Sequence, residues 1–221
     1  MNVLIIGASR GIGYELARQH HEARDTVYAS ARGQTGIAKL KELGVNTLVV
    51  NTADALGCSG LSWGIDGTRF DRIWHVAGVF GPRTAGVEPP VAQDFDLVMH
   101  TNVLGFMRLA PQYFDALATG GRIGVLSSKM GSIGLRASPS GWTYRASKAA
   151  LNSAVKDASL VLGSRGVVAA FHPGWVQTDM GGTGADIPVE RSVADLRRTI
   201  DALKPADTGG FFNHDGQALA W

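Results

Sequence analysis

The stretch NVLIIGASRGIGYELARQ, residues 2–19, decides the fold. It opens with an apolar, β-forming run and continues after a glycine-rich turn into helix-forming residues. Gly7, Gly11 and Gly13 are spaced G-x-x-x-G-x-G in that turn. Glycines let the backbone approach a ligand closely, and the N-terminus of the following helix offers free N–H groups to a pyrophosphate. The stretch therefore predicts a dinucleotide-binding strand–turn–helix unit, with a tight turn that binds nothing as the alternative.

Strand-like and helix-like segments alternate along the rest of the chain. We expect strands buried on both faces at 2–6, 25–30, 45–50, 71–76, 121–127 and 166–172. Helices are expected at 11–23, 35–43, about 92–118, about 142–163 and 189–203, and GGFF at 209–212 is a candidate edge strand. Such alternation is typical of an α/β fold, a doubly wound parallel sheet with helices on both faces. No linker divides the chain, so 1–221 is expected to form a single domain.

The composition excludes several classes of protein. The 221 residues are 45% hydrophobic and 18% charged, with a net charge of +2 and no dense run of Lys or Arg, so no nucleic-acid-binding face is expected. No segment is long and apolar enough to cross a membrane. Cys58 is the single cysteine, which excludes a disulfide within the chain, and the six histidines lack metal-ligand spacing. We expect a cytoplasmic protein without a metal.

The run YRASKAALN, from Tyr144 to Asn152, places a tyrosine four residues before a lysine. Four residues make about one helical turn, so Tyr144 and Lys148 share a face. A phenol has a pKa near 10 and is a poor acid–base catalyst at neutral pH, but a nearby ammonium lowers that pKa. The pair therefore indicates a tuned proton donor, or else a helix brace. Ser127 and Ser128 follow the strand at 121–127, at the edge where doubly wound sheets bind ligands.

The end of the second strand, YASARG (28–33), bears on the choice of nucleotide. Proteins that bind NAD usually carry an acidic residue here for the ribose 2′-hydroxyl. This chain has Arg32 instead, and Arg10 lies inside the glycine turn. Two guanidinium groups suit a 2′-phosphate, so NADP(H) is preferred over NAD(H). The alternative is that both are solvated surface charges.

Four motifs in this order, GASRGIG, TNVLG, the serine pair and YRASK, resemble those of the short-chain dehydrogenase/reductase family over essentially the whole chain. SSKMGSIG, YRASKAALN, HPGWVQTDMGG and HDGQALAW look more narrowly like the C-factor and sniffer-type carbonyl reductases. The resemblance implies a Rossmann-type sheet of about seven strands and NADPH-dependent hydride transfer between nicotinamide and a carbonyl or alcohol. It also implies a homo-dimer or homo-tetramer, although some relatives are monomers.

The resemblance assigns roles to four residues. Tyr144 would be the general acid or base, and Lys148 would lower its pKa and bind the nicotinamide ribose. Ser128 would hydrogen-bond the substrate oxygen, because the second serine of the pair is the usual catalytic one. Asn102 in TNVLG resembles the asparagine that holds a water linking Lys148 to solvent.

The resemblance also implies a set of cofactor contacts. Pro173 and Gly174 would shape the backbone beside the nicotinamide, and the Val176 backbone and Thr178 hydroxyl would hold its carboxamide. The full expected set is Gly7, Ser9, Arg10, Gly11, Ile12, Gly13, Arg32, Asn51, Ala77, Gly78, Asn102, Tyr144, Lys148, Pro173, Gly174, Val176 and Thr178.

Three features depart from the family pattern. Val76 in HVAG stands where the family often has Asn, which puts the grip on the cofactor in question. Asn51 replaces the usual Asp, a milder change because its carbonyl still accepts from the adenine amino group. The gap between Ser128 and Tyr144 is a few residues longer than in many members, and RASPSGW (136–142) would absorb the excess.

Other readings stay open. A nucleotide-binding signalling or partner-binding protein of the C-factor type, with weak or no turnover, is the main alternative; a sugar-nucleotide epimerase would need a larger C-terminal region.

Asp179 and Met180 could line the substrate mouth, with a loop-capping role for Asp179 as the alternative. Trp142 and Trp175 could form an apolar wall or simply pack. The helix near 92–118, with Phe95, Leu97, Val98, Val103 and Leu109, is expected to serve the core and a subunit interface.

Overall fold

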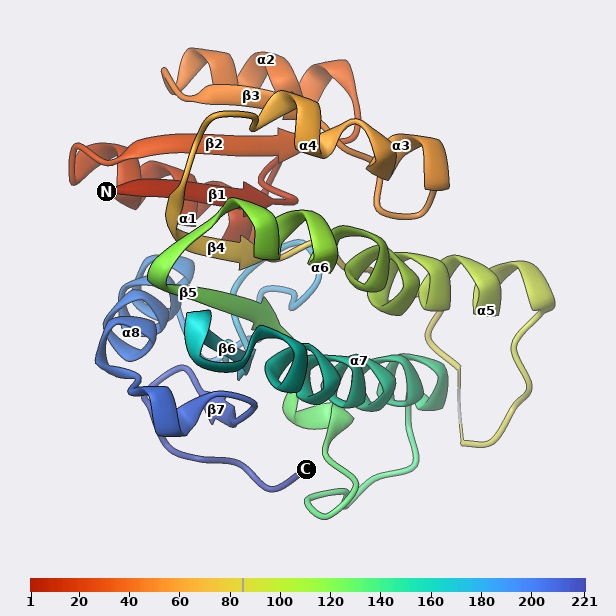
Figure 1. Ribbon diagram of the computed structural model, residues 1–221. Coiled ribbons are helices and arrows are strands. Elements are labelled where there is room, and N and C mark those ends of the chain that lie inside the picture. The colour runs from red at the N-terminus through yellow and green to blue at the C-terminus, as the bar shows by residue number, and fades with distance from the viewer. Residues whose placement is uncertain (85) are drawn as a thin grey trace.

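The computed structural model describes residues 1–84 and 86–221, and they form one parallel sheet with helices on both faces (Figure 1). The strands are β1 (Asn2–Ile6), β2 (Thr26–Ala31), β3 (Asn46–Val49), β4 (Phe70–His75), β5 (Leu117–Leu126), β6 (Gly166–His172) and β7 (Phe211–Asn213). Their order across the sheet is β3-β2-β1-β4-β5-β6-β7, and every neighbouring pair is parallel. The order reverses between β1 and β4, and ligands of such sheets bind at the carboxyl ends of the strands at this point.

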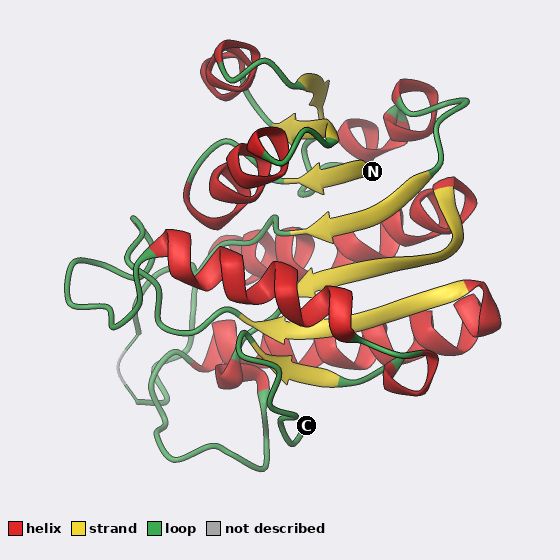
Figure 2. Cartoon of the chain, turned by 90° about the vertical axis from the view of Figure 1, so that its left-hand side faces the viewer, coloured by secondary structure: helices red, strands yellow, loops and turns green. Residues whose placement is uncertain are grey.

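The helices cover the sheet in two groups. They are α1 (Gly11–Glu22), α2 (Gln34–Glu42), α3 (Ala55–Ser59), α4 (Leu61–Gly64), α5 (Ala92–Met99), α6 (Gly105–Ala116), α7 (Trp142–Leu162) and α8 (Val189–Ala202). One core cluster joins the sheet to α6 and α7, and the other joins it to α1, α2 and α8. In Figure 2 the strand arrows point the same way and the longer loops gather at their tips. The longer loops therefore lie at the carboxyl edge of the sheet, where ligands of such sheets bind.

Strand β1 shows why the residues 2–19 govern the fold. Leu4 and Ile6 belong to the core cluster on the α6 and α7 face, while Val3 and Ile5 belong to the cluster on the opposite face. Successive side chains of a strand point to opposite faces, so a continuous apolar run is needed where helices cover both. Each of these four side chains is fully buried, which contributes about 1.5–3 kcal/mol apiece to stability.

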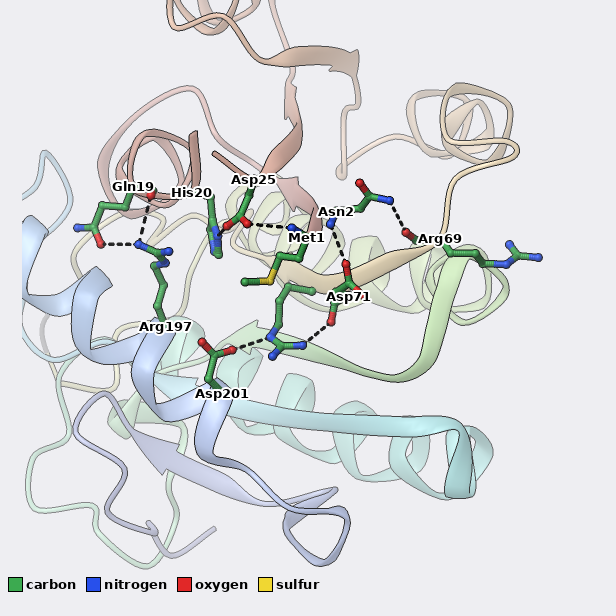
Figure 3. Close-up of polar contacts among 10 residues, drawn as sticks. Met1, Asn2, Gln19, His20, Asp25, Arg69, Asp71, Arg197 and Asp201 are labelled. Carbon is green, nitrogen blue, oxygen red and sulfur yellow. Dashed lines mark hydrogen bonds and ion pairs between the residues drawn. The ribbon is translucent and has the colours of Figure 1, made fainter. Parts of the chain in front are cut away.

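Polar contacts close the amino edge of the sheet (Figure 3). The N-terminal ammonium of Met1 contacts Asp25 Oδ1 at 3.0 Å, and the other oxygen of that carboxylate is 2.8 Å from His20 Nδ1. Asn2 N donates to Asp71 Oδ2 at 2.8 Å. Burial alone would raise the pKa of Asp25, but the hydrogen bonds from His20 and the N-terminal ammonium outweigh it and hold that pKa below its usual value. Charged contacts therefore tie this edge of the sheet together.

Three expectations from the sequence need correction. The strand at 45–50 is not buried on both faces: β3 lies at the edge of the sheet, pairs with β2 alone, and leaves Val49 64% exposed. The strand expected at 121–127 begins earlier, at Leu117. The helix expected near 92–118 is two helices, α5 and α6, joined by a π-helical turn at His100–Leu104. Of its five apolar residues, Val98, Val103 and Leu109 are buried, whereas Phe95 and Leu97 are exposed.

Candidate active site

Two cavities meet at Tyr144 on the carboxyl edge of the sheet. The first, about 560 Å³, follows the glycine turn after β1 and the ends of β2 and β4, and we call it the glycine-loop cavity. The second, about 710 Å³, lies between the loops after β4, β5 and β6, and we call it the outer cavity. Both are lined by Ile12, Ser127, Tyr144, Pro173, Thr178 and Met180. A molecule in each cavity would therefore contact the same tyrosine.

The glycine turn is shaped by close backbone contacts. Gly7 has a φ of +90°, and a Cβ there would lie 2.7 Å from the Ala77 nitrogen. A Cβ on Gly13 would lie 2.1 Å from the Gly7 oxygen. No side chain caps α1, and its first turn holds no acidic residue. The first N–H groups of α1 are thus available to an anion, as a pyrophosphate site requires.

Arg10 and Arg32, which the sequence singled out, line the same cavity, together with Lys39. Arg10 Nη1 lies 3.3 Å from Asp179 Oδ2 at the mouth, and Lys39 Nζ lies 4.0 Å from the centre of the Tyr14 ring. The sequence analysis missed Lys39. Thr35, one helical turn earlier on α2, also lines the cavity and was missed as well.

The N-terminus of α2 also faces this cavity. Helix α2 begins at Gln34 after Gly33, has no side-chain cap and carries no acidic residue in its first turn. A Cβ on Gly36 would lie 2.8 Å from the Cβ atoms of both Ser9 and Ala31, so the helix packs directly on the glycine turn. Two uncapped helix N-termini and three cationic side chains therefore surround one cavity, which fits a ligand with phosphate groups at two places.

The turn after β4 supplies the floor of the glycine-loop cavity. Val76, Ala77 and Gly78 line it, as does Asn51 after β3. The departure from the family pattern at Val76 is accommodated by packing, because its side chain lies against the core cluster of α1, α2 and α8. A Cβ on Gly78 would lie 3.3 Å from Lys148 Nζ, so a side chain here would crowd the lysine.

Tyr144 lies in the first turn of α7 and is almost completely enclosed. The Phe80 ring stacks on it at 4.5 Å between centroids with an interplanar angle of 24°. Burial raises the pKa of Tyr144 to about 12, while a hydrogen bond with Ser128 lowers it in part. The phenol is therefore protonated at neutral pH and can act as a proton donor.

Lys148 lies 5.8 Å from the centre of the Tyr144 ring and is 3% exposed. Its Nζ donates to the Leu126 carbonyl at 2.8 Å, and burial lowers its pKa to about 8. The sequence analysis expected Lys148 to lower the pKa of Tyr144. The Lys148 ammonium is directed at this backbone oxygen, and its expected effect on the Tyr144 pKa stays a prediction.

The two serines after β5 differ in their hydrogen bonds. Ser127 Oγ donates to Asn152 Oδ1 at 2.5 Å in a buried position. Ser128 Oγ accepts from the Met130 nitrogen at 3.1 Å, hydrogen-bonds Tyr144 and lines the outer cavity. A substrate oxygen beside Tyr144 would thus meet Ser128 rather than Ser127.

Asn102 lies in the π-helical turn and is fully buried. Its Nδ2 donates to the Val79 carbonyl at 2.8 Å and to Ser147 Oγ at 3.0 Å, and its Oδ1 accepts from the Val79 nitrogen at 2.8 Å. Among the described residues, Asn102 does not line either cavity. It clamps the chain after β4 beside Lys148, and its expected role in a water relay stays a prediction.

The loop after β6 joins the two cavities. Pro173 and Thr178 line both, whereas Gly174 and Val176 line the outer cavity only. Thr178 Oγ1 accepts from the Gly181 nitrogen at 3.2 Å, which helps to hold the loop.

The residues considered for the substrate mouth are distributed differently. Met180 lines both cavities and Trp175 the outer one, whereas Asp179 lines the glycine-loop cavity. Trp142 lines neither among the described residues. Four residues that also line the outer cavity were missed, because their positions in loops, in a helix and at the end of β6 carry no spacing signal: Phe80, Arg83, Arg145 and His172.

The end of the chain braces the outer cavity. The Trp221 carbonyl oxygen accepts from the Gly134 nitrogen at 3.1 Å and from Ser132 Oγ at 3.2 Å. The Trp221 ring stacks on Phe211 of β7 at 5.4 Å. These contacts hold the loop after β5, whose Leu135 forms part of the cavity wall.

Residues 1–84 and 86–221 contain no group of three His, Cys, Asp or Glu side chains that could hold a metal ion. None of their helices is long and apolar enough to cross a membrane.

Comparison with known proteins gives a consistent picture. A family model described as short chain dehydrogenase matches residues 1–186. A 1-hydroxy-2-glutathionyl-2-methyl-3-butene dehydrogenase of Rhodococcus sp. strain AD45 is 31% identical over 233 residues, which cover 99% of each chain. The C-signal protein of Myxococcus xanthus is 41% identical over 123 residues, which cover 54% of this chain and 74% of that protein.

Solved structures agree with these relatives. The carbonyl reductase Sniffer of D. melanogaster superposes with a TM-score of 0.90 at 28% identity, covering 100% of this chain and 99% of that one. A carbonyl reductase from Pseudomonas aeruginosa PAO1 in complex with NADP has a TM-score of 0.86 at 31% identity, with coverage of 100% and 99%. The expected doubly wound sheet and the resemblance to C-factor and sniffer-type carbonyl reductases are confirmed.

Proposed function

Because this chain belongs to the short-chain dehydrogenase family, we propose that it is an NADPH-dependent oxidoreductase that transfers a hydride between nicotinamide and a carbonyl or alcohol. The observation that carries the proposal is the meeting of the two cavities at Tyr144. A nucleotide in the glycine-loop cavity and a carbonyl compound in the outer cavity would approach each other there. Such positioning alone can remove several kcal/mol of barrier, about 7–11 in the best cases.

The residues present fit a nicotinamide dinucleotide. The uncapped N-terminus of α1 would hold the pyrophosphate, and Lys148 would contact the nicotinamide ribose. When bound, the cofactor supplies or accepts the hydride. In the reducing direction Tyr144 donates its proton to the carbonyl oxygen, and Ser128 hydrogen-bonds that oxygen as charge develops on it.

The preference for NADPH rests on the charge of the glycine-loop cavity. Arg32 and Lys39 are exposed, line the cavity near the end of β2 and form no ion pair with a described residue. The cavity's acidic side chain, Asp179, is already paired with Arg10. A 2′-phosphate would meet a cationic surface there, whereas the cavity's one carboxylate among the described residues, Asp179, is held by Arg10 rather than free for a ribose hydroxyl.

Titration with NADPH and NADH tests this preference. Arg32→Asp should weaken NADPH binding about tenfold or more and leave NADH binding within about threefold. Lys41→Asp is the matched control, because Lys41 is exposed on α2, the helix that follows Arg32, and does not line the cavity. Equal binding of the two nucleotides by the unaltered protein would overturn the preference.

The reaction is tested by NADPH consumption with a panel of aldehydes, ketones and quinones. Ser128→Ala should lower kcat/KM about 100-fold for the best substrate, because the developing charge on oxygen loses a hydrogen bond. Ser138→Ala is a control in an exposed loop position of the same cavity. A panel with no substrate, despite tight NADPH binding, would contradict the proposal. It would favour the second candidate, a nucleotide-binding signalling protein, which the similarity to C-signal supports.

We also propose that the chain self-associates as a homo-dimer or homo-tetramer. Large apolar side chains are exposed on three neighbouring helices, namely Phe95 and Leu97 of α5, Met107 of α6, and Leu160 and Val161 of α7. Light scattering after size exclusion should give a mass above that of one chain, and Leu160→Glu should reduce it. A monomer at micromolar concentration would contradict this proposal.

A further inference from the structure

The outer cavity has an unbalanced charge. Arg83, Lys129 and Arg145 line it, and no aspartate or glutamate does so among the described residues. Much of the remaining wall is apolar, including Phe80, Met130 and Leu135. The glycine-loop cavity has cations of its own, so the phosphates of a nucleotide do not account for these three charges.

Arg145 differs from the other two cations because it is buried. It is 8% exposed, and its guanidinium donates to two backbone carbonyls, from Nε to Ser140 at 2.7 Å and from Nη1 to Met130 at 3.5 Å. No carboxylate of residues 1–84 or 86–221 forms an ion pair with it, and these residues offer no hydrogen-bond partner to its Nη2. A buried charge without a counter-charge is costly, so such arginines are usually paired. Arg145 Nη2 is not among the side-chain atoms that are cut off from solvent, so an anion in the outer cavity can reach it.

The surroundings add positive charge. Burial, followed by repulsion from Arg136, lowers the pKa of Arg145. Burial together with His214 and Lys129 lowers the pKa of His172, another wall residue, to about 4. Both histidine and arginine therefore experience a positive field, and an enclosed positive field attracts anions.

Arg83 connects this charge to the reacting group. Its guanidinium carbon lies 5.1 Å from the centre of the Phe80 ring, and Phe80 stacks on Tyr144. A substrate that reaches Tyr144 through the outer cavity therefore passes a cationic side chain, an aromatic face and the buried Arg145.

We propose that the substrate is an apolar carbonyl compound that carries a carboxylate, which Arg145 binds while the carbonyl lies at Tyr144. The inference rests on the proposed function, because it takes Tyr144 as the place where the carbonyl reacts. Arg145 is a substrate-selecting residue in this account, and the exposed Arg83 and Lys129 draw the anion into the cavity.

Two matched pairs of substrates test the proposal. 4-Formylbenzoate and 3-(4-formylphenyl)propanoate place the acid at different distances from the aldehyde, and the methyl ester of each removes the charge. We expect the ratio of kcat/KM for acid to ester to be at least about tenfold at low salt in one pair, about 1.4 kcal/mol, and to fall as salt is added.

Variants separate recognition of the anion from a structural role. Arg145→Gln should bring the acid-to-ester ratio close to one, and Arg145→Lys should retain part of it. Equal losses on acid and ester would indicate that Arg145 only supports the loop, and would overturn the proposal. Arg165→Gln, an exposed arginine far along the chain at the other end of α7, should leave the ratio unchanged. If Arg145→Gln does not fold, the double variant Arg83→Gln/Lys129→Gln should still lower the ratio about threefold.

A binding measurement keeps the inference distinct from the proposed function. The alcohol 4-(hydroxymethyl)benzoate and its methyl ester can be titrated by calorimetry into the NADP-loaded protein. Tighter binding of the acid, weakened by Arg145→Gln, would support the anion site even if no aldehyde is reduced. Equal binding of acid and ester, or no binding of either, would overturn it.

Discussion

Replacing Phe80 by alanine should lower the pKa of Tyr144 without touching any atom of the tyrosine. The pKa of about 12 is caused by burial, and the ordinary value for a phenol is about 10. Phe80 covers one ring face at 4.5 Å between centroids, so its removal opens that face to water. We expect a decrease of about one pKa unit, or about 1.4 kcal/mol.

The assay is the ultraviolet absorbance of tyrosinate after rapid jumps in pH, on the cofactor-free protein. Subtracting the signal of Tyr144→Phe isolates one phenol among the four tyrosines. Phe80→Leu is the matched control, because it retains an apolar cover and should shift the pKa by only a few tenths. If the Tyr144 pKa is the same in Phe80→Ala as in the unaltered protein, burial by Phe80 is not a cause of the raised pKa, and the reasoning is refuted.

The same shift has a consequence for stability. A phenol ionises near pH 10 in the unfolded chain and near 12 in the folded one, so the unfolded state releases its proton first. The stability that comes from the protonated, buried phenol is present below pH 10 and is lost as the pH rises from about 10 to about 12. In Phe80→Ala the folded-state pKa is lower, so the loss of this stability should be complete at a lower pH than in the unaltered protein.

Three further predictions address other parts of the account. Gly13→Ala would place a Cβ 2.1 Å from the Gly7 oxygen, so it should lower the free energy of unfolding in urea by about 1–3 kcal/mol and weaken NADPH binding. Gly33→Ala is the control, because nothing lies within 4 Å of its Cβ, and it should change neither quantity. Unchanged NADPH affinity in Gly13→Ala would contradict the role given to the glycine turn. Asp25→Asn should lower stability by about 1–3 kcal/mol near neutral pH, because it removes the carboxylate that His20 and the N-terminal ammonium contact. Because the pKa of Asp25 is lowered in the folded protein, this stability is present above about pH 4 and is lost as the pH falls through the folded-state pKa. A stability difference between Asp25→Asn and the unaltered protein that stays the same in acid would contradict this role of Asp25. Ser127→Ala, which breaks the buried bond to Asn152, should reduce stability more than Ser128→Ala in thermal unfolding; the reverse order would contradict the assignment of the structural serine.

The sequence predicted the central fold because its signals there are local. An apolar run at 2–6, glycines at fixed spacing and a helix-forming run decide a strand–turn–helix unit without help from distant residues. The short helices α3 and α4 gave no such signal, since five and four residues are too few for a helical period. The edge position of β3 was not predictable either, because strand order depends on contacts between segments far apart in the chain.

The candidate site also contains some residues that the sequence predicted and others that it did not. Tyr144 and Lys148 were found because one helical turn separates them, and the structure adds that Lys148 donates to Leu126 instead of the phenol. Phe80 and Arg145 could not be found, because what marks them is stacking in one case and burial without a counter-charge in the other. Both properties arise only when loops from different strands meet at the edge of the sheet.

The most direct test of the central claim is the rate of NADPH oxidation by Tyr144→Phe with the best aldehyde, measured beside NADPH binding by the same preparation. Removing the proton donor while leaving the glycine-loop cavity intact should lower kcat about 100- to 10,000-fold and leave the affinity for NADPH within about threefold. Turnover that is unchanged in Tyr144→Phe would contradict the assignment of this tyrosine as the group at which cofactor and substrate meet.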